Sequence, residues 1–178
     1  LGGTDTDTAG DSLTWSVKTA ASNGTATVSG TGSAPVTFTY APTENWSGSD
    51  SFVVQVSDGD LMDEITVNVT VIPVNDSPRI TNALTNGDLV TSITENNSSV
   101  LTLTATDVES DSLAFSISGV DSSSFDLNVT TGALSFKAAP DFENPDDANN
   151  DNVYELLVAV ADGNTTSSSI SLFVTVSD

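Results

Sequence analysis

Apolar and polar residues alternate along short segments of the chain, which is the pattern of half-buried β-strands. In the first such segment, Leu13, Trp15 and Val17 share one face. Turn-forming pairs such as Asn23-Gly24 and Asp58-Gly59 separate the segments. No stretch shows helical periodicity, so the pattern predicts an all-β fold. The predicted strands are 13–18, 25–29, 36–40, 52–56 and 64–72, followed by 89–93, 100–105, 113–118, 125–129, 134–138, 153–160 and 168–176.

The same pattern occurs twice, with the first residues of matching segments 102 to 105 residues apart. Tandem copies of this kind indicate a repeat architecture. Seven short strands at turn spacing favour a small antiparallel sandwich, so we predict two tandem seven-strand Greek-key β-sandwiches, residues 1–76 and 77–178. The first copy lacks its first strand and most of its second, so we expect its start upstream of residue 1. The matching segments are Asp5–Val17 with Asp107–Ile117, Phe52–Gly59 with Leu156–Gly163, and Ile65–Val71 with Ile170–Val176.

The charge of the chain is strongly one-sided, with 25 acids, 3 bases and a net charge of −22. Nucleic acid is excluded as a partner because phosphate binding requires cationic residues. An anionic membrane surface is excluded for the same reason, and no apolar run approaches the ~20 residues of a membrane span. Divalent cations and neutral or cationic surfaces remain as partners.

Cysteine and histidine are both absent. Disulfides, zinc–thiolate sites and thiol catalysis are therefore excluded, together with the commonest general base. Paired carboxylates serve glycoside hydrolysis when one of them lies in an apolar cleft, but these acids are predicted on polar loops. We predict that the chain is not an enzyme and is held together by its core, by metal, or by both.

The acids gather at predicted strand ends and recur with alternate-residue spacing. Clustered carboxylates match the six to eight oxygen ligands that Ca²⁺ takes. A solvated acidic surface, as in proteins adapted to high salt, is the alternative. We favour calcium because the acids occupy matching positions in both copies. The alternate-residue pairs are Asp5/Asp7, Asp107/Glu109 and Asp141/Glu143.

In combination, several motifs resemble the cadherin repeats of large bacterial surface adhesins. They are Asp107-x-Glu109, Asp141-Phe142-Glu143 ahead of strand 153–160, Glu95-Asn96, the Asn75-Asp76 linker and Asp162. The resemblance implies a cadherin/Ig-like fold with calcium held at the ends of each repeat. Phe142 stands where the family has Arg. In the linker, Pro73 and Ser77 replace two ligands, so we expect fewer ions at this junction than a full cadherin junction holds. The implied metal ligands are Asn75, Asp76, Asp107, Glu109, Asp162, Glu95, Asp141 and Glu143, with Asp5 and Asp7 as their counterparts in the first copy.

The resemblance implies a calcium-binding repeat of an extracellular bacterial protein, secreted or on the cell surface, which acts as a calcium-rigidified adhesive or structural rod in cell adhesion and biofilm. Its partners would be calcium, neighbouring repeats of the same polypeptide, and polysaccharide or other surface proteins. The alternative is a calcium-dependent carbohydrate-binding module, with Trp46 in a polar loop as its exposed platform. The acidic run 146–151 has no counterpart in the first copy and is either a solvated loop or a local ion site.

Overall fold

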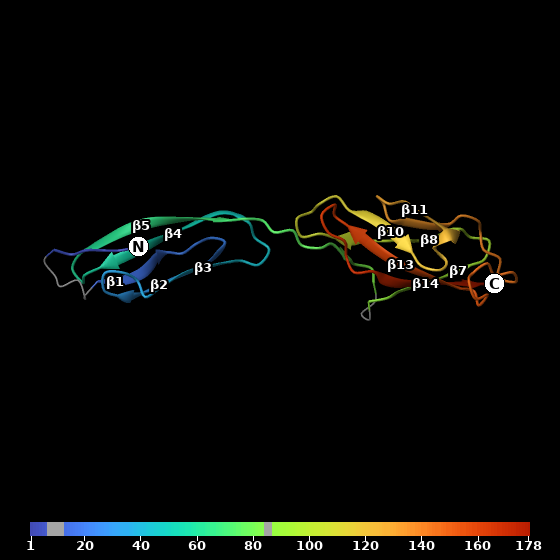
Figure 1. Ribbon diagram of the computed structural model, residues 1–178, viewed down its shortest axis with the longest axis horizontal. Helices are drawn as coiled ribbons and strands as arrows, with labels where there is room; N and C mark the ends of the chain where they lie inside the picture. The colour runs from blue at the N-terminus through green and yellow to red at the C-terminus, as the bar shows by residue number, and fades with distance from the viewer. Residues whose placement is uncertain (7–12, 84–86) are drawn as a thin grey trace. The chain divides into compact units, whose positions relative to one another are not determined.

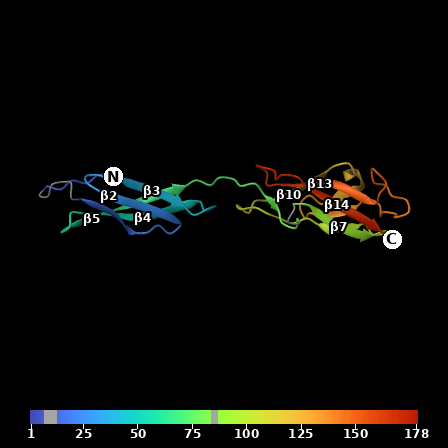
Figure 2. The same ribbon diagram turned by 90° about the horizontal axis from the view of Figure 1, so that it is seen from below.

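The computed structural model describes residues 1–6, 13–83 and 87–178 (Figures 1 and 2). The fold is all-β as predicted, and one 3₁₀ turn, Ser122–Ser124, is the only helix in the described ranges. The chain divides into two compact units, Leu1–Val74 (unit 1) and Asn75–Asp178 (unit 2). None of the helical structure described is long and apolar enough to cross a membrane.

Unit 1 is a single sheet of five strands in the order β3-β2-β1-β4-β5. All pairs in it are antiparallel, and β2 is bonded to β3 over its length but to β1 only at Thr14↔Thr31 and Trp15↔Gly30. Where the pattern predicted two facing sheets, hydrogen bonds therefore join all five strands into one. The strands are β1 (Thr14–Thr19), β2 (Gly24–Thr31), β3 (Thr37–Pro42), β4 (Gly48–Ser57) and β5 (Met62–Val71).

The core of unit 1 forms where β2 and β3 fold back over β4. Trp15, Val28, Phe52 and Val54 are its buried residues, and the ring of Tyr40 on β3 stacks on Phe52 with centroids 6.1 Å apart. The indole N–H of Trp15 donates to the Gly32 carbonyl at 2.9 Å, so the only polar atom of this ring is satisfied.

Unit 2 contains a four-stranded sheet in the order β10-β13-β14-β7 and a three-stranded sheet in the order β11-β12-β8. β7 pairs in parallel with β14, from Leu172↔Leu89 to Ser177↔Thr94. A two-stranded sheet of β6 and β9 completes the unit. Its strands are β6 (Arg79–Ile80), β7 (Leu89–Thr94), β8 (Ser99–Thr102), β9 (Ala105–Thr106), β10 (Ala114–Ser118), β11 (Phe125–Leu127), β12 (Ala133–Phe136), β13 (Val153–Ala161) and β14 (Ile170–Ser177).

The core of unit 2 lies between these sheets and is larger than that of unit 1. The alternate residues Tyr154, Leu156, Val158 and Val160 of β13 are at most 2% exposed. Phe125, Phe136 and Tyr154 form an aromatic cluster, with Phe136 and Tyr154 edge-to-face at 4.8 Å. Trp15 and Phe115, which occupy matching positions in the two copies, are both buried core residues.

Candidate metal centres in unit 2

Strand β13 separates two groups of acidic residues within unit 2. Asp162 follows the last residue of β13, whereas Asp141 and Glu143 lie in the loop that precedes its first residue. β13 has 9 residues, and at about 3.3 Å per residue it spans roughly 30 Å. The two groups therefore lie at opposite ends of the unit. We call Asn75, Asp76, Asp107, Glu109 and Asp162 the entry group, and Glu95, Asp141 and Glu143 the acidic triad.

Asp162 is the most strongly held member of the entry group and is 8% exposed. Its Oδ1 accepts hydrogen bonds from the amides of Asn164 (2.7 Å) and Thr165 (2.6 Å). Its Oδ2 accepts from the Thr165 hydroxyl (2.9 Å) and the Asn75 side-chain amide (2.9 Å). The Thr165 amide and the Asn75 side chain, ahead of the remaining donors, hold the pKa of Asp162 far below its ordinary value despite its burial. This carboxylate is therefore charged at neutral pH.

Asn75 ties the entering chain to this carboxylate. Besides Asp162, its Nδ2 lies 3.2 Å from the Thr165 hydroxyl, and its Oδ1 accepts from Asn164 Nδ2 at 2.9 Å. The amide of the next residue, Asp76, donates to Glu109 Oε2 at 3.2 Å. The structure thus connects Asn75 with Asp162 and Asp76 with Glu109 through hydrogen bonds.

Asp107 has one carboxylate oxygen that lacks a hydrogen-bond partner. Its Oδ1 accepts from the amide of Asp111 at 3.1 Å, but its Oδ2 is buried and has no hydrogen-bond partner. A buried carboxylate oxygen without a partner is costly, and a cation would satisfy it. Among the residues that the structure describes, the only salt bridge joins Lys18 and Glu64 in unit 1, so no basic side chain of unit 2 forms an ion pair there.

The carboxylate oxygens of the acidic triad lie closer together than those of the entry group. Glu95, Asp141 and Glu143 each offer a carboxylate oxygen, and these oxygens lie within 4.8 Å of one another. Ligands 2.3–2.6 Å from one Ca²⁺ lie at most about 5 Å apart, so this spacing fits a shared ion. Within the described ranges no other three acids meet this spacing, which means that the entry group does not present a closed three-carboxylate cage.

Backbone contacts hold the triad in place. The Glu95 amide donates to Ser177 O at 2.8 Å, which extends the β7–β14 pairing by one residue. Glu95 Oε2 accepts from the amide of Phe142 at 2.9 Å. Asp141 Oδ1 accepts from the amides of Glu143 and Asn144, both at 3.1 Å. Glu95 is half-buried, and the two loop acids are exposed. Phe142 is thus held through its backbone, while its side chain remains 36% exposed.

Of the two predicted ligands of the first copy, the structure describes only Asp5. Asp7 lies outside the described residues. Asp5 is half-buried and lines a hollow together with Asp58 and Asp63 at the turn between β4 and β5. Asp58 Oδ1 is bonded to the amides of Asp60 and Leu61, at 2.9 and 2.7 Å.

Three further aspartates, Asp50, Asp121 and Asp147, are structural anchors, a role that the sequence pattern did not predict. Asp50 accepts from the amides of Ser22, Asn23 and Ser51 and from the Tyr40 hydroxyl, at 2.8–3.1 Å. Burial raises the pKa of Asp50, but these donors outweigh it and leave the pKa below its ordinary value. Burial and the neighbouring Asp50 raise the pKa of Tyr40.

Two buried carboxylates anchor the acidic run 146–151: Asp147 within the run and Asp121 outside it, which are 4% and 5% exposed. Asp147 accepts from the amides of Asp151 (3.0 Å) and Asn152 (3.1 Å). Asp121 accepts from the amides of Ala148 (2.8 Å) and Glu155 (2.7 Å). The run is therefore an ordered loop built on two buried carboxylates rather than a freely solvated one. The only sequence signal for this anchoring role of Asp121 is its position just before a Ser-Ser-Ser segment.

Trp46, the candidate carbohydrate platform, is half-buried. Its indole ring lies against Gly48, where an added Cβ would approach Trp46 Cζ2 to 3.4 Å. The ring thus contacts its own loop with part of its surface.

Comparison with known proteins supports the fold. Residues 1–70 match the family model described as Bacterial Ig domain. The chain is structurally similar to Drosophila N-cadherin EC1-4 (TM-score 0.62, 19% identity, 97% of this chain and 44% of that one). It is also similar to mouse Cadherin-23 EC22-24 (TM-score 0.62, 17% identity, 96% and 55%) and human CDH23 EC21-23 (TM-score 0.66, 12% identity, 94% and 59%). The chain thus spans about half the length of these structures. No curated protein sequence matches it.

Proposed function

We propose that this chain is a calcium-binding modular repeat of an extracellular bacterial protein, and that it acts as a structural or adhesive spacer stiffened by calcium. The convergence of Glu95, Asp141 and Glu143 within 4.8 Å carries the proposal. These acids come from two separate segments of the chain, and each is held by a backbone contact at its own position. Their mutual repulsion without a counter-ion is the cost that calcium would remove.

The entry group supplies a second ligand set. Calcium there would satisfy the buried Asp107 Oδ2 and draw on Asp162, Glu109 and Asp76. Asn75 already uses both ends of its side-chain amide, so it would serve mainly to orient Asp162. Because Asn75 and Asp76 are the first residues of unit 2, an ion at this point would stiffen the segment through which the chain enters the unit.

The cadherin/Ig-like fold and the bacterial family match over residues 1–70 support an extracellular setting. Extracellular calcium modules bind at roughly 10⁻⁴–10⁻³ M, so sites of this class would fill outside a cell and remain largely empty in cytosol. Neighbouring repeats of the same polypeptide are the partners expected for a spacer.

The test is a luminescence titration with Tb³⁺, which replaces Ca²⁺ at oxygen sites and is excited through nearby tyrosine. Tyr154 and Asp141 line the same hollow, so Tb³⁺ at the triad should emit on tyrosine excitation, and Ca²⁺ should displace it. The Glu95→Gln/Glu143→Gln variant should lose this emission. Asp126→Asn, which removes an exposed acid of β11 outside both groups, should retain it.

The Asp107→Asn/Glu109→Gln variant separates the two sites by calorimetric titration. It should lose one class of calcium binding while retaining the triad emission. Emission that persists in the triad variant, or that Ca²⁺ fails to displace, would show that the triad is not a calcium site.

A further inference from the structure

The four-stranded sheet of unit 2 has one face that points away from the core. Residues along each strand alternate between the two faces, and the register places outward residues in rows such as Glu155↔Phe173 and Phe173↔Val90. In Figure 2, β13, β14 and β7 lie side by side. We call the outward positions the outer face, and they are residues 90 and 92 of β7, 114, 116 and 118 of β10, 155, 157 and 159 of β13, and 171, 173 and 175 of β14.

The outer face is almost free of charge. Glu155 is its only charged residue, whereas the whole chain carries 25 acids and a net charge of −22. The other positions of the outer face hold small, hydroxyl or apolar residues. Two copies of a strongly anionic chain repel each other where their acids approach, and this repulsion is weak across a face with a single acid.

Part of the outer face is apolar and open to solvent. Leu157 is 43% and Val90 58% exposed, and the half-buried Phe173 lies opposite Val90 in the sheet. At the rim, Val120 is 69% exposed. A hollow of about 220 Å³ beside it is lined by Gly119, Leu157 and Phe173 among others. The face thus presents both an apolar projection and a largely apolar hollow.

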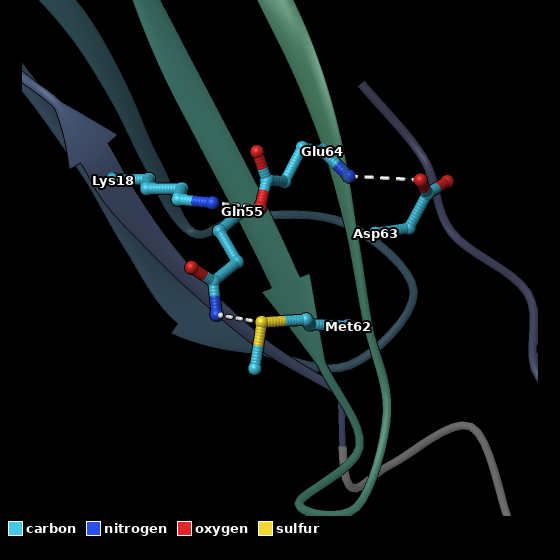
Figure 3. Close-up of polar contacts among 5 residues, drawn as sticks. All are labelled: Lys18, Gln55, Met62, Asp63 and Glu64. Carbon is cyan, nitrogen blue, oxygen red and sulfur yellow. Dashed lines mark hydrogen bonds and ion pairs between the residues drawn. The ribbon is translucent and has the colours of Figure 1, made fainter.

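The corresponding face of unit 1 is polar instead. On the outward side of β1, β4 and β5, Lys18 pairs with Glu64, and Gln55 lies beside them (Figure 3). The position that Phe173 occupies in unit 2 is held in unit 1 by Asn68. Antiparallel sheets commonly turn a polar face to solvent. The repeat itself therefore does not require the apolar, charge-poor surface that unit 2 carries.

We propose that the outer face of unit 2 binds the same face of a second copy of this chain. The contact is two-fold, because it joins one patch to itself, and the exposed Val120 of each copy enters the hollow of the other. With strands about 4.8 Å apart and about six residues of about 3.3 Å in each, the outer face covers roughly 400 Å². Two such faces bury about 800 Å² together, which is below the standard size of a stable interface and predicts a weak, reversible dimer.

A charged partner fits the outer face less well than a second copy does. A cationic protein finds its counter-charges at the acidic loops rather than on this face, and an anionic protein is repelled by the chain as a whole. A second copy offers a matching apolar surface at a place where the acids of both chains are kept apart.

The test is sedimentation equilibrium of the full chain in chelator, at rising protein concentration and at low and high NaCl. The average mass should rise with concentration from that of one chain toward that of two. High salt should strengthen the association, because it screens the repulsion between the two anionic copies while leaving an apolar contact in place.

Two substitutions place a charge on the outer face. Val90→Asp and Leu157→Asp should each weaken the association at least about tenfold, because the new carboxylate loses its water in the contact and faces a like charge. Val36→Asp makes the same change at a valine of unit 1 that is 81% exposed, and this matched control should associate as the wild type does. Far-UV circular dichroism verifies that each variant is folded.

A wild-type chain that remains monomeric at every concentration and salt would overturn the proposal, as would folded outer-face variants that associate as strongly as Val36→Asp. Association that weakens in high salt would also contradict an apolar interface. A dimer that forms only in calcium and is lost in the Glu95→Gln/Glu143→Gln variant would place the contact at the acidic triad and overturn it too. Because the expected dimer forms in chelator, this proposal and the calcium proposal succeed or fail separately.

Discussion

Val69 in unit 1 and Val174 in unit 2 occupy the same position of the repeat but differ in their surroundings. Val174 is completely buried, because β14 lies between β13 and β7 and under the second sheet. Val69 is half-buried, because β5 is at the edge of its sheet. Nearly the same strand sequence thus gives a central strand or an edge strand according to the neighbours available, which no local pattern encodes.

Among the substitutions, the largest expected effect comes from truncating these matched valines. Val174→Ala removes two methyl groups from a closed core and should lower the free energy of unfolding of unit 2 by about 2 kcal/mol. Val69→Ala should cost less than about 1 kcal/mol, since solvent already reaches the side chain. Urea unfolding of both variants measures the two losses, with Trp fluorescence reporting unit 1 and far-UV circular dichroism reporting both units. Equal losses would show that β5 is as well covered as β14.

Acid unfolding of unit 1 should depend on Asp50. Its pKa is lower in the folded state than its ordinary value of 3.8, so its stabilising contribution is present above about pH 4 and is lost as the pH falls below it. Asp50→Asn should destabilise unit 1 at pH 7, because the new side-chain NH₂ faces donors such as the Asn23 amide. It should also flatten the fall in stability below pH 4.

The measurement is the urea midpoint by Trp fluorescence from pH 7 to pH 2, in chelator. Asn23 and Tyr40 both bond to Asp50 Oδ2, and Tyr40→Phe serves as the control that removes one donor but keeps the carboxylate. An Asp50→Asn variant with the wild-type pH profile would show that Asp50 does not couple folding to pH.

The smallest effect is expected for the surface pair of Lys18 and Glu64, which are 45% and 37% exposed. Exposed ion pairs contribute about 0–1 kcal/mol and are screened by salt. Glu64→Gln should therefore lower the stability of unit 1 only slightly at low salt and not at all at 1 M NaCl. A loss that persists at high salt would indicate that Glu64 supports the β5 edge by packing instead.

Much of the fold was predictable from local sequence. Each of the twelve predicted segments overlaps a strand of the structure, because alternation and turn pairs are local signals. The two-residue strand Arg79–Ile80 was missed, since a segment that short shows no alternation. The predicted strand 100–105 is divided into β8 and β9, which depends on their different partners, β12 and β6.

The candidate site was predictable in part for a similar reason. The convergence of Glu95 with Asp141 and Glu143 agrees with their shared place in the cadherin-like pattern, although their role as ligands remains a proposal. The buried roles of Asp50, Asp121 and Asp147 were not predictable, because an acid that accepts backbone amides at a loop has the same sequence appearance as a solvated one. Only the surrounding backbone distinguishes the two.

Calcium should stabilise unit 2, where both ligand groups lie, more than unit 1. The direct test is differential scanning calorimetry of the full chain in calcium against chelator, with magnesium as the control cation. At 100 times Kd, one ion adds about 2.7 kcal/mol, so the transition of unit 2 should move up by on the order of 10 °C. The transition of unit 1, followed separately by Trp fluorescence, should move less. Unchanged Tm values in calcium, or an equal shift with magnesium, would contradict the proposal that this chain is a calcium-binding repeat.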